Sequence, residues 1–260
     1  MTVAVHHVID AAAELPADSP TVVLSNSLGT THHMWDKQVL QLSRHFRVVR
    51  YDTRGHGRSP APRGPYSIDD LTDDVVALLD HLGLARVHFV GLSLGGMTGM
   101  RFAIREPDRV GRLVLLCTSA HLEPESAWRQ RAATVREHGS RAVASAVVER
   151  WYTERWRTAN PDMTAAAIDI VAGTPSEGYA SCCEAIASMN QVPDLSQLAA
   201  PTLAIAGADD PATPPPHLRL IANSVKDGRL LTVVNAAHLA NDEQPAIVTA
   251  AVLEHLRANP

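Results

Sequence analysis

One short glycine-rich segment, residues 91–95, has the spacing of a catalytic serine. It reads Gly-Leu-Ser-Leu-Gly and matches G-x-S-x-G, the motif of a nucleophile elbow. The apolar residues 86–90 predict a buried strand before it, and residues 96–105 carry apolar side chains at helical spacing after it. Ser93 would then project its hydroxyl from a strained turn at a helix N-terminus, where free N–H groups favour negative charge. The alternative is a glycine-rich turn without chemistry.

A serine hydroxyl needs a base to become a nucleophile, and His238 is the best-placed candidate. It follows the predicted strand 230–234, and Asp209 and Asp210 follow the predicted strand before that one. Catalytic groups in parallel sheets collect beyond the carboxyl ends of the strands, and a carboxylate is needed to fix the imidazole tautomer. We therefore expect Ser93, one of the two aspartates and His238 to meet. The alternative for His238 is a surface position, since the chain has 13 histidines.

The oxyanion of such a reaction is usually bound by two backbone N–H groups. One would come from Leu94, directly after the serine, and the other from the loop after the predicted strand 21–25, with Leu28 as the candidate. Many enzymes with this elbow carry His-Gly where this chain has Asn26 and Ser27. Because the donor is a backbone group, the change is tolerable, and these two side chains either cap the turn or contact substrate.

The elements that would position these groups alternate along the chain. Apolar runs predict strands at 21–25, 46–51, 86–90, 112–117, 202–206 and 230–234, with a looser outer strand at 3–9. Helical spacing predicts helices at 35–45, 67–82, 96–105, 216–224 and 245–257. This alternation predicts the α/β class, with a mostly parallel sheet flanked by helices on both faces.

Between residues 121 and 192 the alternation stops. Four helix-like segments follow one another there, at 126–138, 141–151, 163–171 and 178–189. We interpret residues 121–192 as a helical cap inserted into a core domain made of residues 1–120 and 193–260.

Composition excludes several classes of function. With 260 residues, 45% of them hydrophobic, the chain can bury one large core, and its net charge of −5 offers no basic surface for nucleic acid. Three cysteines without C-x-x-C spacing favour a reducing compartment. No apolar run has signal-peptide or membrane-spanning length. We expect a soluble cytoplasmic protein without membrane contact, a monomer or a small homo-oligomer.

Two other polar clusters are weaker candidates for a functional site. Arg54, His56 and Arg58 lie in a loop that either faces the pocket or, as we favour for Arg54, is pinned by structural hydrogen bonds. The adjacent His32 and His33 point in different directions in any regular element and have no metal-like companions in the sequence. We therefore expect no metal and no other cofactor.

Four segments give the chain a family resemblance, at residues 25–30, 50–57, 91–97 and 177–186. On these the chain resembles the 3-oxoadipate enol-lactonases of the α/β-hydrolase superfamily, and the likeness runs nearly end to end. The elbow and the Arg-Gly-His-Gly loop are shared with many hydrolases, so the first and last segments carry the family assignment. The resemblance implies an α/β-hydrolase fold with an eight-stranded, mostly parallel sheet and an inserted cap.

The resemblance also implies an activity. The family opens the lactone ring of 3-oxoadipate enol-lactone to 3-oxoadipate in the β-ketoadipate pathway of aromatic catabolism. Here Ser93 would form an acyl-enzyme, with Leu28 and Leu94 binding the oxyanion. Asp210 rather than Asp209 is the expected acid, because Gly-x-x-Asp before a proline-rich turn is the usual acid position in these proteins.

The small anionic lactone carries a free carboxylate, which a desolvated pocket must neutralise. In the predicted cap, Trp128, Arg131, Arg150 and Trp151 suit a flat anion, and we expect Trp128, Arg131 and Trp151 to bind it. The alternative is that the tryptophans pack the cap onto the sheet while the arginines are solvated.

The triad alone does not choose a substrate. A carboxylesterase, a C–C hydrolase or a perhydrolase on the same scaffold is an alternative, and so is a non-catalytic ligand receptor that uses the same pocket.

Overall fold

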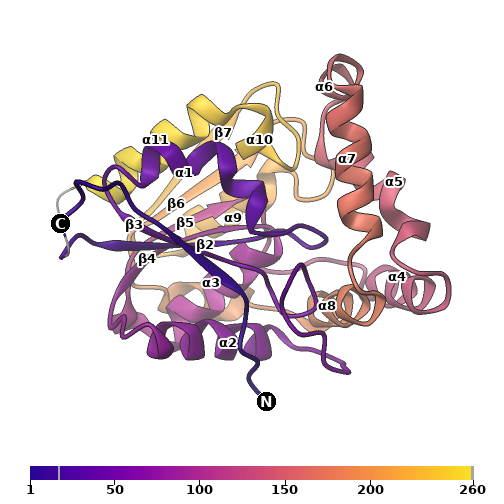
Figure 1. The fold of residues 1–260 in the computed structure, drawn as a ribbon, viewed down its shortest axis with the longest axis horizontal. Helices are drawn as coiled ribbons and strands as arrows, with labels where there is room; N and C mark the ends of the chain where they lie inside the picture. Colours follow the sequence, from indigo (N-terminus) through magenta and orange to yellow (C-terminus); the bar gives the residue numbers. More distant parts are fainter. Residues whose placement is uncertain (17, 259–260) are drawn as a thin grey trace.

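The centre of the molecule is a mixed sheet in the order β1-β3-β2-β4-β5-β6-β7 (Figure 1). It is seen in a computed structural model that describes residues 1–16 and 18–258. β1 runs antiparallel to β3, and all other neighbours are parallel. The strands are β1 His7–Asp10, β2 Thr21–Ser25, β3 Arg47–Tyr51, β4 Val87–Leu92, β5 Val110–Leu116, β6 Thr202–Gly207 and β7 Gly228–Val233. The predicted α/β class and mostly parallel sheet are confirmed.

The sheet has seven strands in the described chain, so the expected number of eight was wrong. Only β1 precedes β2, and the stretch between them contains Pro16 and Pro20, which cannot donate to a strand ladder. The described part of that stretch makes turn hydrogen bonds instead, such as Leu15 N–H to Ala12 O at 3.1 Å.

Helices cover both faces of the sheet. α1 and α11 pack against each other on one face, and α2 and α3 pack against each other on the opposite face (Figure 1). α9 packs on β6 and β7, and the short α10 follows His238. Their bounds are α1 Asp36–Leu42, α2 Ile68–His81, α3 Leu94–Arg105, α9 Pro215–Ser224, α10 Ala240–Glu243 and α11 Pro245–Arg257, with 3-10 turns η1 His32–Trp35, η2 Pro107–Arg109 and η3 Val192–Gln197.

Helix α2 shows how the local sequence fixes an element. Ser67 Oγ accepts a hydrogen bond from the N–H of Asp70, and the Asp70 carboxylate accepts one from the N–H of Ser67, which is a capping box. Leu71, Val75 and Leu79 recur at helical spacing and are at most 2% exposed. The helix therefore begins at the cap and turns its apolar stripe toward the core.

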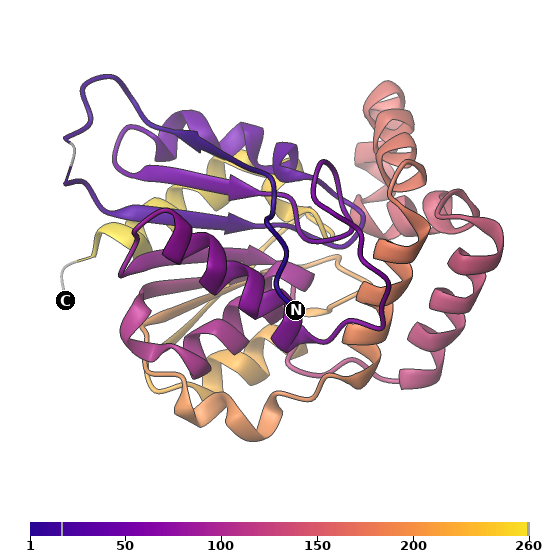
Figure 2. The same cartoon turned by 60° about the horizontal axis from the view of Figure 1, so that its bottom comes forward.

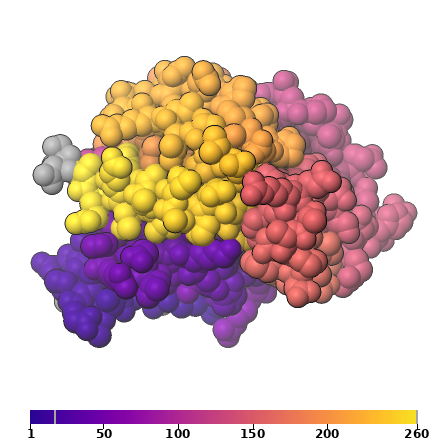
Figure 3. Space-filling view, turned by 90° about the horizontal axis from the view of Figure 1, so that it is seen from above, coloured from indigo at the N-terminus to yellow at the C-terminus, as the bar shows by residue number. Residues whose placement is uncertain are grey.

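Five helices between β5 and β6 stand beside the sheet rather than on its faces (Figures 1 and 2). We call them the cap helices: α4 Glu125–His138, α5 Arg141–Trp151, α6 Glu154–Ala159, α7 Pro161–Ala172 and α8 Ser176–Ser188. Helix α6 was not predicted, because it is too short for a periodic signal, although it starts at a capping threonine, Thr153. Figure 3 shows α6 and α7 beside the C-terminal segment of the chain.

The inner strands are buried on both faces, and residues Val22, Val23 and Leu24 of β2 have no exposed surface. This is why the strands appear in the sequence as continuous apolar runs rather than alternating ones. None of the described helices combines the length and apolar content needed to cross a bilayer.

Candidate active site

The backbone at Ser93 is strained, as predicted for a nucleophile elbow. Ser93 has φ 55° and ψ −115°, between the end of β4 and the start of α3. A Cβ on Gly91 would lie 2.2 Å from Gly95 O, and a Cβ on Gly95 would lie 2.3 Å from Ser25 O. Both positions therefore require glycine, which explains the spacing of the motif.

Hydrogen bonds fix the elbow on three sides. The N–H of Ser93 donates to Leu116 O at 3.0 Å, and Ser93 O accepts from Thr118 Oγ1 at 2.7 Å. The N–H of Gly95 donates to Asn26 O at 2.9 Å. These bonds join the elbow to β5 and to the loop after β2, and among the described residues the Ser93 hydroxyl makes no hydrogen bond.

His238 and Asp210 form the expected pair. His238 Nδ1 lies 2.8 Å from Asp210 Oδ2, and both residues are buried. The Asp210 carboxylate also accepts from Thr213 Oγ1 at 2.7 Å and from the N–H groups of Ala212 and Thr213 at 2.8 and 3.1 Å. Asp209, in contrast, is exposed and turns away from this site into another cavity. The structure therefore pairs Asp210, not its neighbour, with the histidine.

The environment of Asp210 keeps its carboxyl group charged. Burial raises its pKa, but the facing His238 and the hydrogen bonds from Thr213 outweigh burial and lower the pKa to about 2. A charged carboxylate can only accept, so His238 Nδ1 carries the proton in this hydrogen bond. The other ring nitrogen, Nε2, is then left with a lone pair that can accept a proton.

Ser93 and His238 line one cavity of about 210 Å³ between the sheet edge and the cap helices. Leu28 forms part of the same wall. The backbone N–H groups of Leu28 and Leu94 make no hydrogen bond to another residue in the part of the chain that is described. Both amides are thus available to bind an oxyanion beside Ser93.

The loop that carries Leu28 is held by buried polar side chains. Asn26 has no exposed surface, donates to Tyr51 O at 2.6 Å and accepts from Trp35 Nε1 at 3.0 Å. Of the two roles left open for the Asn26–Ser27 pair, Asn26 therefore has the structural one, whereas Ser27 lines the cavity.

The Arg54 to Arg58 loop supports the site instead of facing it. Arg54 is 3% exposed and forms a close ion pair with Asp74, so the structural interpretation is confirmed. His56 was not singled out for a role of its own, yet its Nε2 accepts a hydrogen bond from the N–H of Gly29, next to Leu28, at 2.9 Å. Its other nitrogen, Nδ1, lies 3.2 Å from Arg54 O.

The expectation that His32 and His33 point in different directions was wrong, because their ring centroids lie 4.1 Å apart. The expectation that they lack metal-like companions was also wrong, because His6 and Asp52 lie beside His32. His33 lies beside Asp36 at the surface, and His32 Nδ1 lies 2.9 Å from Asp52 Oδ1 inside the molecule. His6, His32 and Asp52 come within 4.8 Å of one another, a grouping that resembles a metal site. The Asp52 carboxylate is already engaged by the N–H groups of His32 and Arg58, so it serves the fold.

All three predicted substrate-binding residues, Trp128, Arg131 and Trp151, line the cavity with Ser93 and His238. The Arg131 guanidinium lies over the Trp128 ring, 4.5 Å from its centre, which fixes both side chains.

Two further residues belong to the cavity wall: Arg150, which the sequence grouped with the candidate anion-binding residues, and Tyr179, which was not predicted. Arg150 faces the cavity, and its pKa is lowered by burial and by the nearby charge of Arg131. Tyr179 has no exposed surface, and its hydroxyl has no hydrogen-bond partner in the described chain. Among the described residues, neither Arg131 nor Arg150 forms an ion pair with a carboxylate. The cavity wall thus carries positive charge that no carboxylate of the described residues neutralises.

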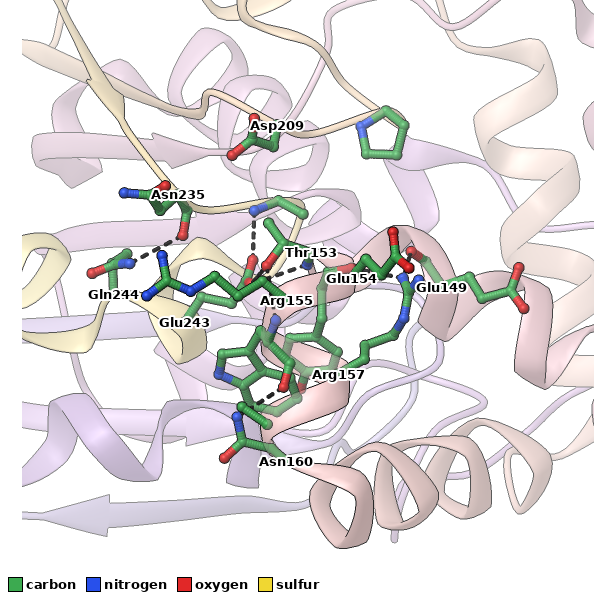
Figure 4. Close-up of a pocket in the computed structure, with 15 residues that line it drawn as sticks. Glu149, Thr153, Glu154, Arg155, Arg157, Asn160, Asp209, Asn235, Glu243 and Gln244 are labelled. Atoms are coloured by element: carbon green, nitrogen blue, oxygen red, sulfur yellow. Dashed lines mark hydrogen bonds between the residues drawn. The ribbon is translucent and has the colours of Figure 1, made fainter.

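A second, wider cavity of about 690 Å³ lies next to the first and contains neither Ser93 nor His238 (Figure 4). It is lined by α6, by the loop that carries Asp209 and by Glu243 at the end of α10. The candidate chemistry therefore belongs to the smaller cavity.

The chain matches a family model described as alpha/beta hydrolase fold over residues 20–245. It is 40% identical to 3-oxoadipate enol-lactonase 2 of Acinetobacter baylyi, over 91% of this chain and 88% of that protein. The crystal structure of the enol-lactonase from Burkholderia xenovorans matches with a TM-score of 0.95 and 41% identity, over 98% of this chain and 97% of that chain. A thermophilic esterase from Thermogutta terrifontis matches with a TM-score of 0.91 and 27% identity, over 98% and 93% of the two chains. Because the family model and these relatives extend over most of its length, this chain belongs to the α/β-hydrolase fold family.

Proposed function

We propose that this chain is a serine hydrolase that opens the lactone ring of 3-oxoadipate enol-lactone through an acyl-enzyme. The proposal rests on Arg131 and Arg150, which share the cavity with Ser93 and form no ion pair with a carboxylate among the described residues. Relatives of 40% and 34% identity bear the name 3-oxoadipate enol-lactonase, which supports this substrate.

In the proposed first step Ser93 Oγ attacks the lactone carbonyl while His238 Nε2 takes the hydroxyl proton. The N–H groups of Leu28 and Leu94 bind the oxyanion of the tetrahedral intermediate. The ring C–O bond then breaks, and the enolate oxygen leaves. An enolate is more stable than an alkoxide, so the C–O bond breaks readily. The enolate then takes the proton from His238 as it becomes the ketone, and His238 is again a neutral base. Water, deprotonated by His238, next attacks the acyl-enzyme and releases 3-oxoadipate.

The free carboxylate of the lactone would accept hydrogen bonds from polar groups of the cavity wall. A buried carboxylate is costly unless it is paired, and Arg131, Arg150 and the Tyr179 hydroxyl can all donate to it. Trp128 and Trp151 provide flat apolar surface for the ring. These residues select an anion, whereas the triad by itself accepts any reactive ester.

The direct test is the loss of enol-lactone ultraviolet absorbance with purified protein, compared with Ser93→Ala and with hydrolysis of neutral p-nitrophenyl acetate. Fast turnover of the lactone that depends on Ser93, with weak ester hydrolysis, is the expected result. Turnover of the ester without the lactone would support a carboxylesterase or another hydrolase of this fold. Tight lactone binding without any turnover would support a receptor and overturn the proposal.

Further parts of the proposal concern the whole molecule. Residues 121–192 would act as a cap that supplies the substrate-binding wall, and residues 1–120 with 193–260 would supply the triad. We propose a cytoplasmic location, supported by the three cysteines, which are buried and unpaired. We also propose that the protein is a monomer or a small homo-oligomer and that it has no nucleic-acid or membrane partner.

A further inference from the structure

Residues 151–153, at the end of α5, form hydrogen bonds with residues 239–243, which follow His238. Trp151 O accepts a hydrogen bond from the N–H of Leu239 at 2.9 Å, and the Tyr152 hydroxyl donates to Asp242 Oδ2 at 2.8 Å. The next residue, Thr153, is bound by Glu243. We call these contacts between residues 151–153 and 239–243 the clasp.

We call residues 236–238, which end at His238, the histidine loop. Among the described residues of the clasp, Glu243 is the one whose side chain is also hydrogen-bonded to this loop. Its Oε2 accepts from the N–H of Ala237, directly before His238, at 2.5 Å. Its Oε1 accepts from the N–H and from Oγ1 of Thr153, at 3.0 and 2.8 Å. Figure 4 shows the Glu243 and Thr153 side chains pointing toward one another across the rim of the wider cavity. Glu243 as a residue is 9% exposed, and both oxygens of its carboxylate accept hydrogen bonds.

The histidine loop has its other support on the opposite side. Ala236 O accepts from the N–H of Asp209, the residue before Asp210, at 2.9 Å. A Cβ on Gly207 would lie 2.1 Å from Ala237 O, so the loop also rests closely on the end of β6. These contacts hold the loop toward the acid, and the Glu243 carboxylate holds it toward the cap helices.

We propose that Glu243 is a positioning residue, whose carboxylate sets the place of His238 by binding the Ala237 amide while it is anchored on Thr153. Trp151 and His238 line the same small cavity from the two sides of the clasp, so this bridge also fixes the wall against the base. The inference rests on the proposed catalytic role of His238 and not on which lactone or ester is the substrate.

The chemistry of the bridge calls for a carboxylate. Each oxygen faces a donor, so a carboxylate satisfies both sides, whereas the amide of glutamine would turn its NH₂ group toward an N–H. Glu243→Gln therefore keeps the size of the side chain and breaks one end of the bridge. Asp242→Asn is the matched control, since it removes the same charge from the same turn. Asp242 binds Tyr152 and Lys37 but not the Ala237 amide.

The test uses paraoxon, a small neutral organophosphate that phosphorylates the serine. The rate at which it phosphorylates Ser93 is measured from the release of one equivalent of p-nitrophenolate. The rate of this reaction depends on how well His238 activates the serine. It does not depend on the residues proposed to bind the substrate carboxylate, because paraoxon is neutral. We expect Glu243→Gln to be labelled about tenfold more slowly, with a similar fall in kcat for p-nitrophenyl acetate and a KM within twofold of wild type. Asp242→Asn should be labelled within twofold of the wild-type rate.

Near-ultraviolet circular dichroism would show whether each variant keeps its tertiary structure. If Glu243→Gln does not fold, Glu243→Asp serves instead, because its shorter carboxylate cannot reach both ends of the bridge. Wild-type labelling rates in a folded Glu243 variant, or an equal loss in Asp242→Asn, would overturn the inference. Failure of wild-type Ser93 to react at all, with Ser93→Ala as the blank, would instead overturn the proposed function.

Discussion

His56 accepts a hydrogen bond from the backbone N–H of Gly29 at 2.9 Å, and so fixes the loop in which Leu28 presents its free amide to the cavity. Burial lowers the pKa of His56, which keeps the imidazole neutral and able to accept at neutral pH. The other nitrogen lies within hydrogen-bond distance of Arg54 O, which fixes the tautomer. A buried histidine thus orients a proposed oxyanion donor without touching the substrate.

His56→Ala should lower kcat about tenfold and leave KM nearly unchanged. The loop loses its anchor, and a displaced oxyanion donor weakens the transition state more than the bound substrate; complete loss of a donor costs about 100-fold to 1000-fold. Steady-state kinetics with p-nitrophenyl acetate measure the effect. His33→Ala changes an exposed histidine of the same region and should leave kcat unchanged. A His56→Ala enzyme with wild-type kcat would contradict the orienting role.

Asp210→Asn should lower kcat by about 10³-fold to 10⁴-fold while the fold is kept. An asparagine can offer its NH₂ group to His238 Nδ1, which places the ring proton on Nε2 and removes the base. Asp209→Asn is the matched control, because Asp209 is adjacent and exposed and should tolerate the change within twofold. Equal losses in the two variants would show that the acid has been assigned wrongly.

Asp210 should also contribute to the acid sensitivity of the folded protein. Its pKa falls from 3.8 to about 2 on folding, so its contribution is complete above about pH 4 and is lost as the pH falls toward 2. The contribution is on the order of 2 kcal/mol. Urea unfolding of wild type and Asp210→Asn at pH 6 and at pH 3 measures it. The difference in free energy of unfolding between the two proteins should shrink at pH 3, and a constant difference would argue against this linkage.

Short-range patterns were sufficient to predict most of the scaffold and the strained turn at Ser93. The elbow at Ser93, the capping box at Ser67 and the apolar strands each depend on residues within about ten positions of one another. Asp210 and His238 were found because the carboxyl ends of parallel strands share one edge, so that their places in the chain order were informative.

Other parts of the site depend on packing that no local pattern contains. The choice of Asp210 over Asp209 came from the family resemblance, because the two residues by themselves do not show the direction that the loop gives to each side chain. Tyr179 lines the cavity because α8 packs against α4, a contact between distant segments. Glu243 and Thr153 are 90 positions apart, so the clasp has no sequence signal.

Gly91→Ala should prevent folding or lower the free energy of unfolding by at least about 3 kcal/mol. The new Cβ would lie 2.2 Å from the backbone oxygen of Gly95, and backbone cannot move aside as a flexible side chain can. Gly83→Ala gives the comparison, because Gly83 has φ +66° but open space around it. Only the backbone strain of about 1 kcal/mol is expected there. Urea unfolding of both variants distinguishes the two costs, and equal stabilities would contradict the crowding argument.

Arg131→Ala should raise KM for the enol-lactone about tenfold to 100-fold and change KM for neutral p-nitrophenyl acetate by less than threefold. The lost hydrogen bonds to a carboxylate are worth about 1.5–3 kcal/mol, and the neutral ester does not use them. Steady-state kinetics with the two substrates measure the ratio. Arg155→Ala removes an exposed arginine from the wider cavity and should change neither KM.

Arg131 also stacks on Trp128, so its removal disturbs the wall as well as the charge. Adipate as a competitive inhibitor separates these effects, because it presents carboxylates without a reacting ring. Inhibition by adipate should weaken in Arg131→Ala about as much as the lactone KM rises, and Arg131→Lys should restore part of both because it returns a positive charge without the planar guanidinium. Equal KM changes for lactone and ester, with unchanged adipate inhibition, would mean that Arg131 shapes the wall and that the carboxylate is bound elsewhere, with Arg150 as the next residue to replace.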